Sequence, residues 1–156
     1  MKKIIFTAAF ILAALSTNAQ TMKTIRMIYP QWQGGSIGAW IPEVKNPDDA
    51  SRGYYLGAQL LDLLAPKNPH QKTITVPVSQ EVGDRTPVEG VIDRDVIAKQ
   101  TKTAVAMLDV EQPERIITLG GECSVSVVPF TWLAKKYEGD VAVLWIDAHP
   151  DTMRWP

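Results

Sequence analysis

The sequence predicts an α/β fold in which helices cover both faces of a parallel sheet. Short runs rich in β-branched residues alternate along the chain with longer segments whose apolar residues have helical spacing. Glycine, proline and aspartate separate these segments, as expected at turns and helix ends. Strands that alternate with helices of this length usually form a parallel sheet with right-handed crossovers. The expected order is therefore βαβαβαβ.

The first half of this order contains two strands and one helix. The first strand is predicted at residues 24–29 and ends at Pro30. A helix is predicted at residues 50–64, where apolar residues recur at helical spacing, and Pro66 closes it. The second strand is predicted at residues 72–79. Together these segments indicate the first crossover unit of a parallel sheet.

The second half begins with a helix that Asp93 is expected to cap and that continues to about Asp109. A short β-branched strand is predicted at residues 115–119, followed by a third helix at 124–137. Residues 141–146 form an uncharged apolar run, which predicts a buried fourth strand.

The five residues after that run, Asp-Ala-His-Pro-Asp, contain the chemistry of a metal site. Open α/β sheets bind their ligands at the carboxyl ends of the strands. Two carboxylates and one imidazole are suitable ligands for a hard or borderline divalent metal. The sequence thus predicts a metal site that includes Asp147, His149 and Asp151. The alternative is a solvated turn, since aspartate and proline are common in turns.

A second group of such residues follows the predicted strand at 115–119. Residues 120–124 read Gly-Gly-Glu-Cys-Ser, and the glycines allow a sharp turn and a close approach to a ligand. If this strand lies beside the strand at 141–146, Cys123 faces the aspartates across a crevice. Taken alone, the two glycines could be a simple turn, and Cys123 could be a small packing residue. Whether Cys123 binds metal is left open by these residues.

The two motifs together resemble those of the ureohydrolase family, which contains arginases, agmatinases and their relatives. The family signatures are Gly-Gly-Asp-His-Ser and, at the same separation as here, Asp-Ala-His-x-Asp. The resemblance covers this chain from about Thr24 to its end and corresponds to roughly the first half of a family member. It implies a truncated, arginase-like, three-layer α/β fold.

The resemblance also implies roles for single residues. Asp147 would bridge two manganese ions, Asp151 would add a second carboxylate to one ion, and His149 would bind the other. Cys123 occupies the position of a histidine ligand, and Glu122 replaces the usual aspartate. Because a thiolate is a softer ligand than imidazole, zinc or iron would also suit this site. The family's remaining ligands lie further along its chains, and no catalytic residue is assigned here.

The function implied by the resemblance is metal-dependent hydrolysis of a guanidino or amidino C–N bond in a small substrate, with release of urea. We expect this chain to be an incomplete and inactive portion of such an enzyme. One alternative is a non-catalytic metal-binding or interaction protein that retains the family fold. Another is an unrelated parallel α/β binding protein whose acidic cluster is incidental. The resemblance further implies a homo-oligomer.

The first nineteen residues have the pattern of a secretory signal peptide. Lys2 and Lys3 precede an apolar run at residues 4–15, and small residues lead up to Ala19. The run is too short to span a membrane comfortably. We therefore expect export to the periplasm or the medium, with residues 20–156 as part of an α/β domain. Otherwise the protein would start at Met22 and be cytoplasmic.

Composition narrows the possible partners. The net charge is −1, which does not predict a nucleic-acid-binding surface. Cys123 is the single cysteine of the sequence, so a disulfide within the chain is excluded.

Overall fold

A three-stranded parallel sheet forms the centre of the structure, which is a computed structural model that describes residues 22–148. The predicted signal peptide, His149 and Asp151 lie outside these residues. The strand order is β2-β1-β3. The strands are β1 (Thr24–Tyr29), β2 (Lys72–Thr75) and β3 (Arg115–Gly120).

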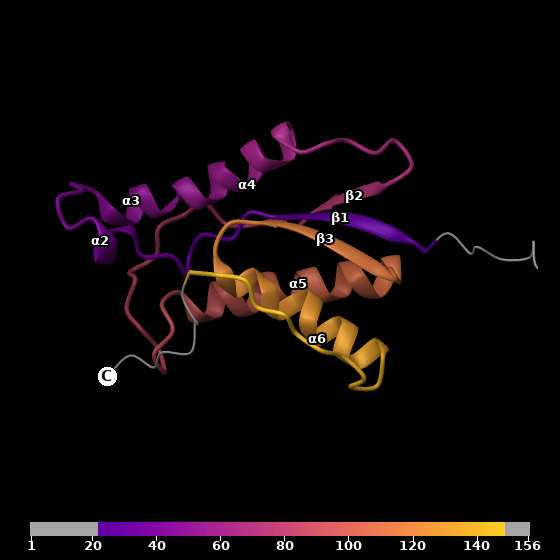
Figure 1. Cartoon of the computed structure of the whole chain (residues 1–156). Helices are drawn as coiled ribbons and strands as arrows, with labels where there is room; N and C mark the ends of the chain where they lie inside the picture. The colour runs from indigo at the N-terminus through magenta and orange to yellow at the C-terminus, as the bar shows by residue number, and fades with distance from the viewer. Residues whose placement is uncertain (1–21, 149–156) are drawn as a thin grey trace, which may run out of the picture.

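Helices cover both faces of the sheet, which confirms the predicted three-layer α/β arrangement (Figure 1). One layer contains α2, α3 and α4, and the other contains α5 and α6. Within residues 22–148, no helix is long and apolar enough to cross a membrane. The helices are α2 (Ile37–Trp40), α3 (Pro47–Ser51), α4 (Gly53–Leu64), α5 (Arg94–Glu111) and α6 (Val127–Lys136), with the 3₁₀ turn η1 (Cys123–Ser126) before α6.

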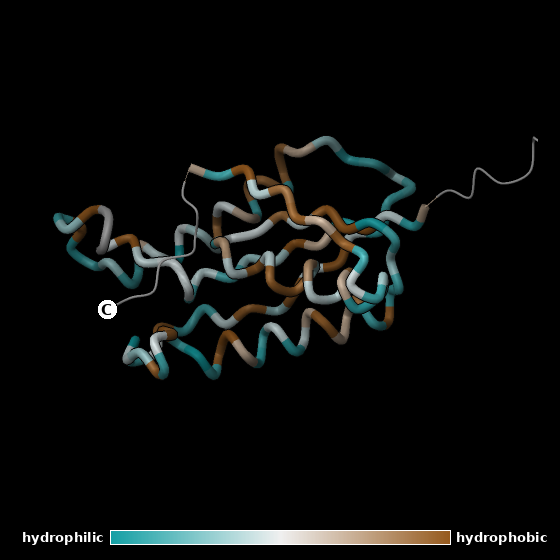
Figure 2. The backbone as a smooth tube through the Cα atoms, turned by 60° about the horizontal axis from the view of Figure 1, so that its bottom comes forward, coloured by the Kyte–Doolittle hydropathy of each residue, from teal (hydrophilic) through white to brown (hydrophobic). Residues whose placement is uncertain are grey.

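The core lies mainly between the sheet and the layer of α5 and α6. Alternate residues of a strand point to opposite faces, so Ile25, Met27 and Tyr29 all face this layer and are fully buried. They pack in one cluster with Leu108 of α5 and Trp132 of α6. Figure 2 shows the corresponding apolar stretches of the chain in brown. This packing fixes β1 and its carboxyl end relative to the two helices.

The other face of β1 carries a buried arginine. Arg26 bonds through Nη1 to Oδ1 of Asp62 in α4, at 3.2 Å, and through Nη2 to the carbonyl oxygen of Pro66. Because Asp62 is also paired with Lys67, hydrogen bonding and positive charge lower the pKa of this carboxyl group. These bonds attach the carboxyl end of α4 to the centre of the sheet.

The second strand is shorter than predicted. The strand ends at Thr75. One further backbone hydrogen bond follows it, from the amide of Val76 to the carbonyl of Ile28 at 2.8 Å. Pro77 has no amide hydrogen to donate, so it cannot continue the ladder. The remaining residues up to Ser79 form a loop.

The predicted fourth strand is wrong. The segment 141–146 has no partner in the three-stranded sheet, and Leu144 and Ile146 are 83% and 87% exposed. The ring of Trp145 instead contacts Phe130 of α6 edge-on, with centroids 6.4 Å apart. An apolar, β-branched run favours an extended chain, but a strand also requires a neighbour, which local sequence does not specify. Asp147 therefore does not follow a strand of this sheet.

Candidate functional site

The carboxyl ends of β1 and β3 lie side by side and carry the candidate site. The parallel register places Tyr29 opposite Gly120. Backbone bonds continue beyond the strands, from the amide of Gly121 to the carbonyl of Tyr29 and from the amide of Glu122 to the carbonyl of Gln31, each at 3.1 Å. The loop after β1 and the Gly-Gly-Glu-Cys-Ser motif after β3 are thus joined into one structure.

Two glycines allow these loops to approach so closely. A Cβ atom on Gly121 would lie 1.9 Å from the carbonyl oxygen of Gln31. A Cβ atom on Gly34 would lie 2.8 Å from Oε2 of Glu122. These glycines thus permit close packing between the loop after β1 and the motif after β3, whereas their approach to a ligand stays a prediction.

Glu122 uses its carboxylate to hold the turn that contains Cys123. It is the N-cap of η1, and its Oε2 accepts a hydrogen bond from the amide of Ser124 at 2.8 Å. Its Oε1 accepts bonds from Oγ of Ser124 at 2.6 Å and from Nε2 of Gln31 at 2.9 Å. Both carboxylate oxygens are therefore engaged within the protein, which makes Glu122 a structural residue of the motif.

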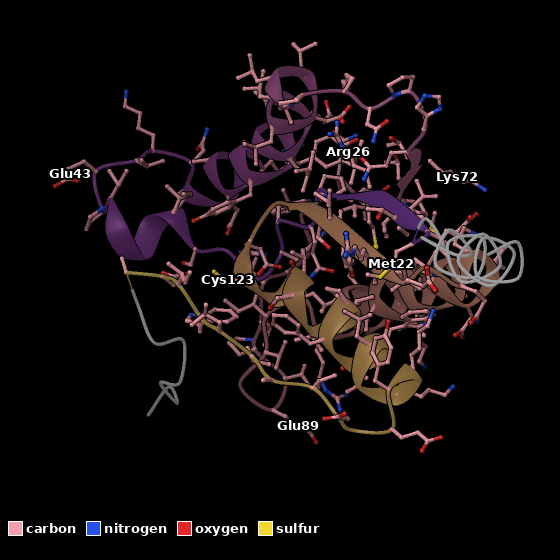
Figure 3. The ribbon with its side chains drawn as sticks, turned by 45° about the vertical axis from the view of Figure 1, so that its right-hand side comes forward. Met22, Arg26, Glu43, Lys72, Glu89 and Cys123 are labelled. Carbon is pink, nitrogen blue, oxygen red and sulfur yellow. The ribbon has the colours of Figure 1, made fainter. Side chains whose placement is uncertain are left out.

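Cys123 is the first residue of η1 and is exposed (Figure 3). The carbonyl oxygen of Cys123 accepts a bond from Oγ of Ser126 at 2.7 Å, so its backbone is held on the carboxyl side as well. This exposure contradicts the interpretation of Cys123 as a small buried packing residue. An exposed thiol on a fixed turn can reach a ligand in solvent.

The Asp-Ala-His-Pro-Asp motif is described only up to its second residue. Asp147 lies in a bend after the segment 141–146, which forms no strand, and His149 and Asp151 are outside the described residues. Within residues 22–148, no three histidine, cysteine, aspartate or glutamate side chains form a group that could hold a metal ion. The predicted meeting of Cys123 with these aspartates thus stays a prediction.

A cluster of buried glutamines behind the motif was not predicted from sequence. Nε2 of Gln100 donates to Oε1 of Gln31 at 2.9 Å and to Oε1 of Gln33 at 3.2 Å. Oε1 of Gln100 accepts a bond from the amide of Ser79 at 2.9 Å. Gln100 belongs to α5, so this cluster connects the helix layer with the loop after β1.

One signal for this cluster is present in the sequence. Gln100 precedes Ala104 and Leu108 at intervals of four residues, and all three are buried on the same side of α5. A glutamine in line with an apolar helix face predicts a buried amide, and buried amides need hydrogen-bond partners.

Arg85 fixes the same loop from the irregular segment between β2 and α5. Its Nη1 donates to Oδ2 of Asp93 at 2.6 Å and to the carbonyl of Gln33 at 2.8 Å, and its Nη2 donates to the carbonyl of Gly35 at 3.0 Å. Its guanidinium also lies over the ring of Trp32, 5.3 Å from the centroid. Asp93 occupies the N-cap position of α5, as predicted, but its carboxylate makes no cap bond and binds Arg85 instead.

Tyr29 completes the polar cluster at the end of β1. Its hydroxyl donates to Oε1 of Gln31 at 3.0 Å. Burial raises the pKa of the Tyr29 hydroxyl, and the negative charge of Glu122 raises it further. Tyr29 therefore stays neutral and acts as a hydrogen-bond donor in this cluster.

Comparison with known proteins agrees with the motifs and the fold. Residues 58–155, more than half of the chain, match the arginase family. The chain is also similar to arginase 2, chloroplastic/mitochondrial, of Arabidopsis thaliana, with 33% identity over 78 residues. That alignment covers 47% of this chain and 22% of the relative, so the matched part spans about a fifth of the relative's length. The two motifs, the parallel three-layer fold and these similarities show that the chain belongs to the arginase family.

Proposed function

We propose that this chain supplies part of the metal centre of a ureohydrolase, a hydrolase that releases urea from a small guanidino or amidino compound. The observation that carries the proposal is the exposed Cys123, held on a fixed turn where β3 ends, in a chain of the arginase family. Asp147, His149 and Asp151 would supply the other ligands from the second motif.

The donor chemistry suits a divalent metal. The described donors are the thiol of Cys123 and the carboxylate of Asp147, and the sequence adds an imidazole and a second carboxylate in His149 and Asp151. Carboxylates and imidazole fit manganese, whereas the thiolate fits zinc or iron better. When bound, a pair of such ions would supply a hydroxide nucleophile at neutral pH. Glu122 would stay outside the ligand set, because Ser124 and Gln31 already occupy its carboxylate oxygens.

Replacement of Asp147 tests the metal site directly. We expect Asp147→Asn to weaken binding of Mn²⁺ and Zn²⁺ by more than about tenfold, since loss of an outer-shell partner alone commonly costs about 10–100-fold. Isothermal titration calorimetry on the purified chain measures this change. Asp140→Asn, at an exposed residue after α6, is the matched control and should bind as the wild type does. Equal binding by wild type and Asp147→Asn would remove the metal-site assignment.

Turnover is expected to need more than these 156 residues. The family's second set of aspartate ligands lies further along its chains, so we expect no urea release from this chain alone. Urea would be measured with arginine, agmatine and guanidinobutyrate in the presence of Mn²⁺. Turnover above the blank that contains metal without protein would contradict this prediction.

Cys123, which stands in place of a histidine ligand, favours a second candidate function: a non-catalytic metal-binding protein that retains the family fold. If the product of the complete gene binds metal but also releases no urea from these substrates, the non-catalytic metal-binding protein is the better description. Urea release by that product would instead support the ureohydrolase.

A further inference from the structure

Gln31 and Gln100 form a directed chain of hydrogen bonds that ends at Glu122. The amide of Ser79 donates to Oε1 of Gln100 at 2.9 Å, and Nε2 of Gln100 donates to Oε1 of Gln31 at 2.9 Å. Nε2 of Gln31 then donates to Oε1 of Glu122, also at 2.9 Å. The chain therefore runs from the loop after β2, through α5, to the motif after β3.

The two ends fix the direction of every bond in this chain. A glutamine amide can turn over and exchange its donor and its acceptor. The backbone amide of Ser79 can only donate, and an ionised carboxylate such as that of Glu122 can only accept. Gln100 must therefore present its oxygen to Ser79, and Gln31 must present its Nε2 to Glu122. With any other arrangement, buried polar atoms would lack partners.

The burial of the two glutamines makes this arrangement rigid. Gln31 and Gln100 are 1% and 4% exposed. In an environment of low dielectric constant, hydrogen bonds are strong and an unpaired polar group is costly. Gln31 thus fixes the orientation of the Glu122 carboxylate from the buried side. The same carboxylate accepts its other hydrogen bonds from the amide and the hydroxyl of Ser124.

We infer that Gln31 and Gln100 are positioning residues for the proposed metal centre. They act through Glu122, which holds the backbone on both sides of Cys123, and Gln31 also donates directly to Oγ of Ser124 at 2.7 Å. Together these bonds direct where the Cys123 thiol can reach. This inference rests on the proposed function for its metal-binding consequence. Its structural part, the control of the Cys123 turn by the two glutamines, is independent of metal.

Substitution of each glutamine by methionine distinguishes a positioning role of the amide from simple filling of the core. Gln31→Met and Gln100→Met preserve an unbranched side chain of similar size but remove the amide. If the glutamines only fill the core, both variants should keep the Cys123 turn and its metal binding unchanged. Gln80→Met makes the same chemical change at an exposed residue next to Ser79 and is the matched control.

Cobalt titration reads out the metal-binding consequence. Co²⁺ bound by a thiolate gives a charge-transfer absorption that reports directly on the Cys123 ligand. We expect Gln31→Met and Gln100→Met to weaken Co²⁺ binding by about 10–100-fold, as for other residues that support a ligand. We also expect the thiolate absorption per bound ion to decrease, with Gln80→Met like the wild type. Wild-type affinity and absorption in both methionine variants would overturn the inference.

Hydrogen exchange of the Ser124 amide tests the structural part without metal. This amide donates to Glu122, so we expect it to be protected in the wild type and in Gln80→Met. We expect it to exchange about tenfold faster in Gln31→Met and Gln100→Met. An unprotected Ser124 amide in the wild type overturns the inference even if the variants do not fold. If exchange changes as expected but the wild type shows no thiolate absorption, the positioning of the turn stands and Cys123 is not a metal ligand.

Discussion

Replacement of Gly121 by alanine is expected to lower the free energy of unfolding by about 3 kcal/mol, the upper part of the usual range for overpacking. The added Cβ atom would lie 1.9 Å from the carbonyl oxygen of Gln31, which is a backbone atom. No side-chain rotation can relieve this contact, so the two loops must separate. Their separation would also break the bond between the amide of Glu122 and the carbonyl of Gln31. Urea denaturation followed by tryptophan fluorescence measures the loss.

Gly57→Ala is the matched control. Gly57 lies inside α4, and a Cβ atom there would meet no atom within 4 Å. Because alanine favours the helix, we expect this variant to be more stable than the wild type by about 0.5–1 kcal/mol. A Gly121→Ala protein as stable as the wild type would contradict the close contact between the loops after β1 and β3.

The second large effect is expected for Arg85→Ala, which should destabilise the protein by about 3–5 kcal/mol. The side chains of Arg85 and Asp93 are 10% and 6% exposed, and they are 2.6 Å apart. Loss of the guanidinium leaves a buried carboxylate without its cation and also leaves the carbonyls of Gln33 and Gly35 without a donor. Thermal and urea unfolding would both show the change.

Arg94→Ala provides the comparison for this prediction. Arg94 is the first residue of α5 and pairs with Glu89 at 2.8 Å, but both side chains of this pair are largely exposed to solvent. Exposed pairs contribute about 0–1 kcal/mol. If Arg85→Ala and Arg94→Ala lowered the free energy of unfolding equally, the burial of Arg85 would add nothing to stability.

Elements that depend on local sequence were predicted closely. The strand predicted at residues 24–29 is β1, and the one at 115–119 is β3 without its last residue. Both are β-branched runs that proline or glycine ends, and these signals lie within the segment itself. The helix expected at 50–64 is divided at Arg52 into α3 and α4, directly before Gly53, a residue that weakens helices but does not by itself predict a break.

Features that depend on distant residues were missed. The fourth strand was predicted from the composition of residues 141–146, but a strand also requires a neighbouring strand, and composition does not indicate whether one is present. Arg85 binds Gln33 and Gly35, about fifty positions earlier in the chain, although its own segment is polar and rich in turn residues. Charged residues in such a segment are usually solvated, so the composition of the segment does not reveal that the side chain of Arg85 is largely buried.

The residues of the first motif were identified from the sequence, but the residues that support them were not, and the metal ligands stay a prediction. Cys123 and Glu122 were identified from the motif, and the structure places them on the turn that follows β3. Of the glutamines behind them, Gln100 had a signal in its alignment with Ala104 and Leu108, whereas Gln31 and Gln33 lie in a loop with no such spacing. Their partners come from three separate segments, which a single sequence does not bring together.

The position of β1 has a consequence for how the protein is made. It is the central strand, yet its neighbours begin at Lys72 and Arg115, well after it in the chain. A nascent β1 thus leaves the ribosome without either partner, and its apolar side chains stay uncovered during synthesis of the next ninety or so residues. Such long-range pairing slows folding and prolongs the exposure of aggregation-prone surface. Chaperones that shield early apolar segments should therefore raise the yield of folded protein.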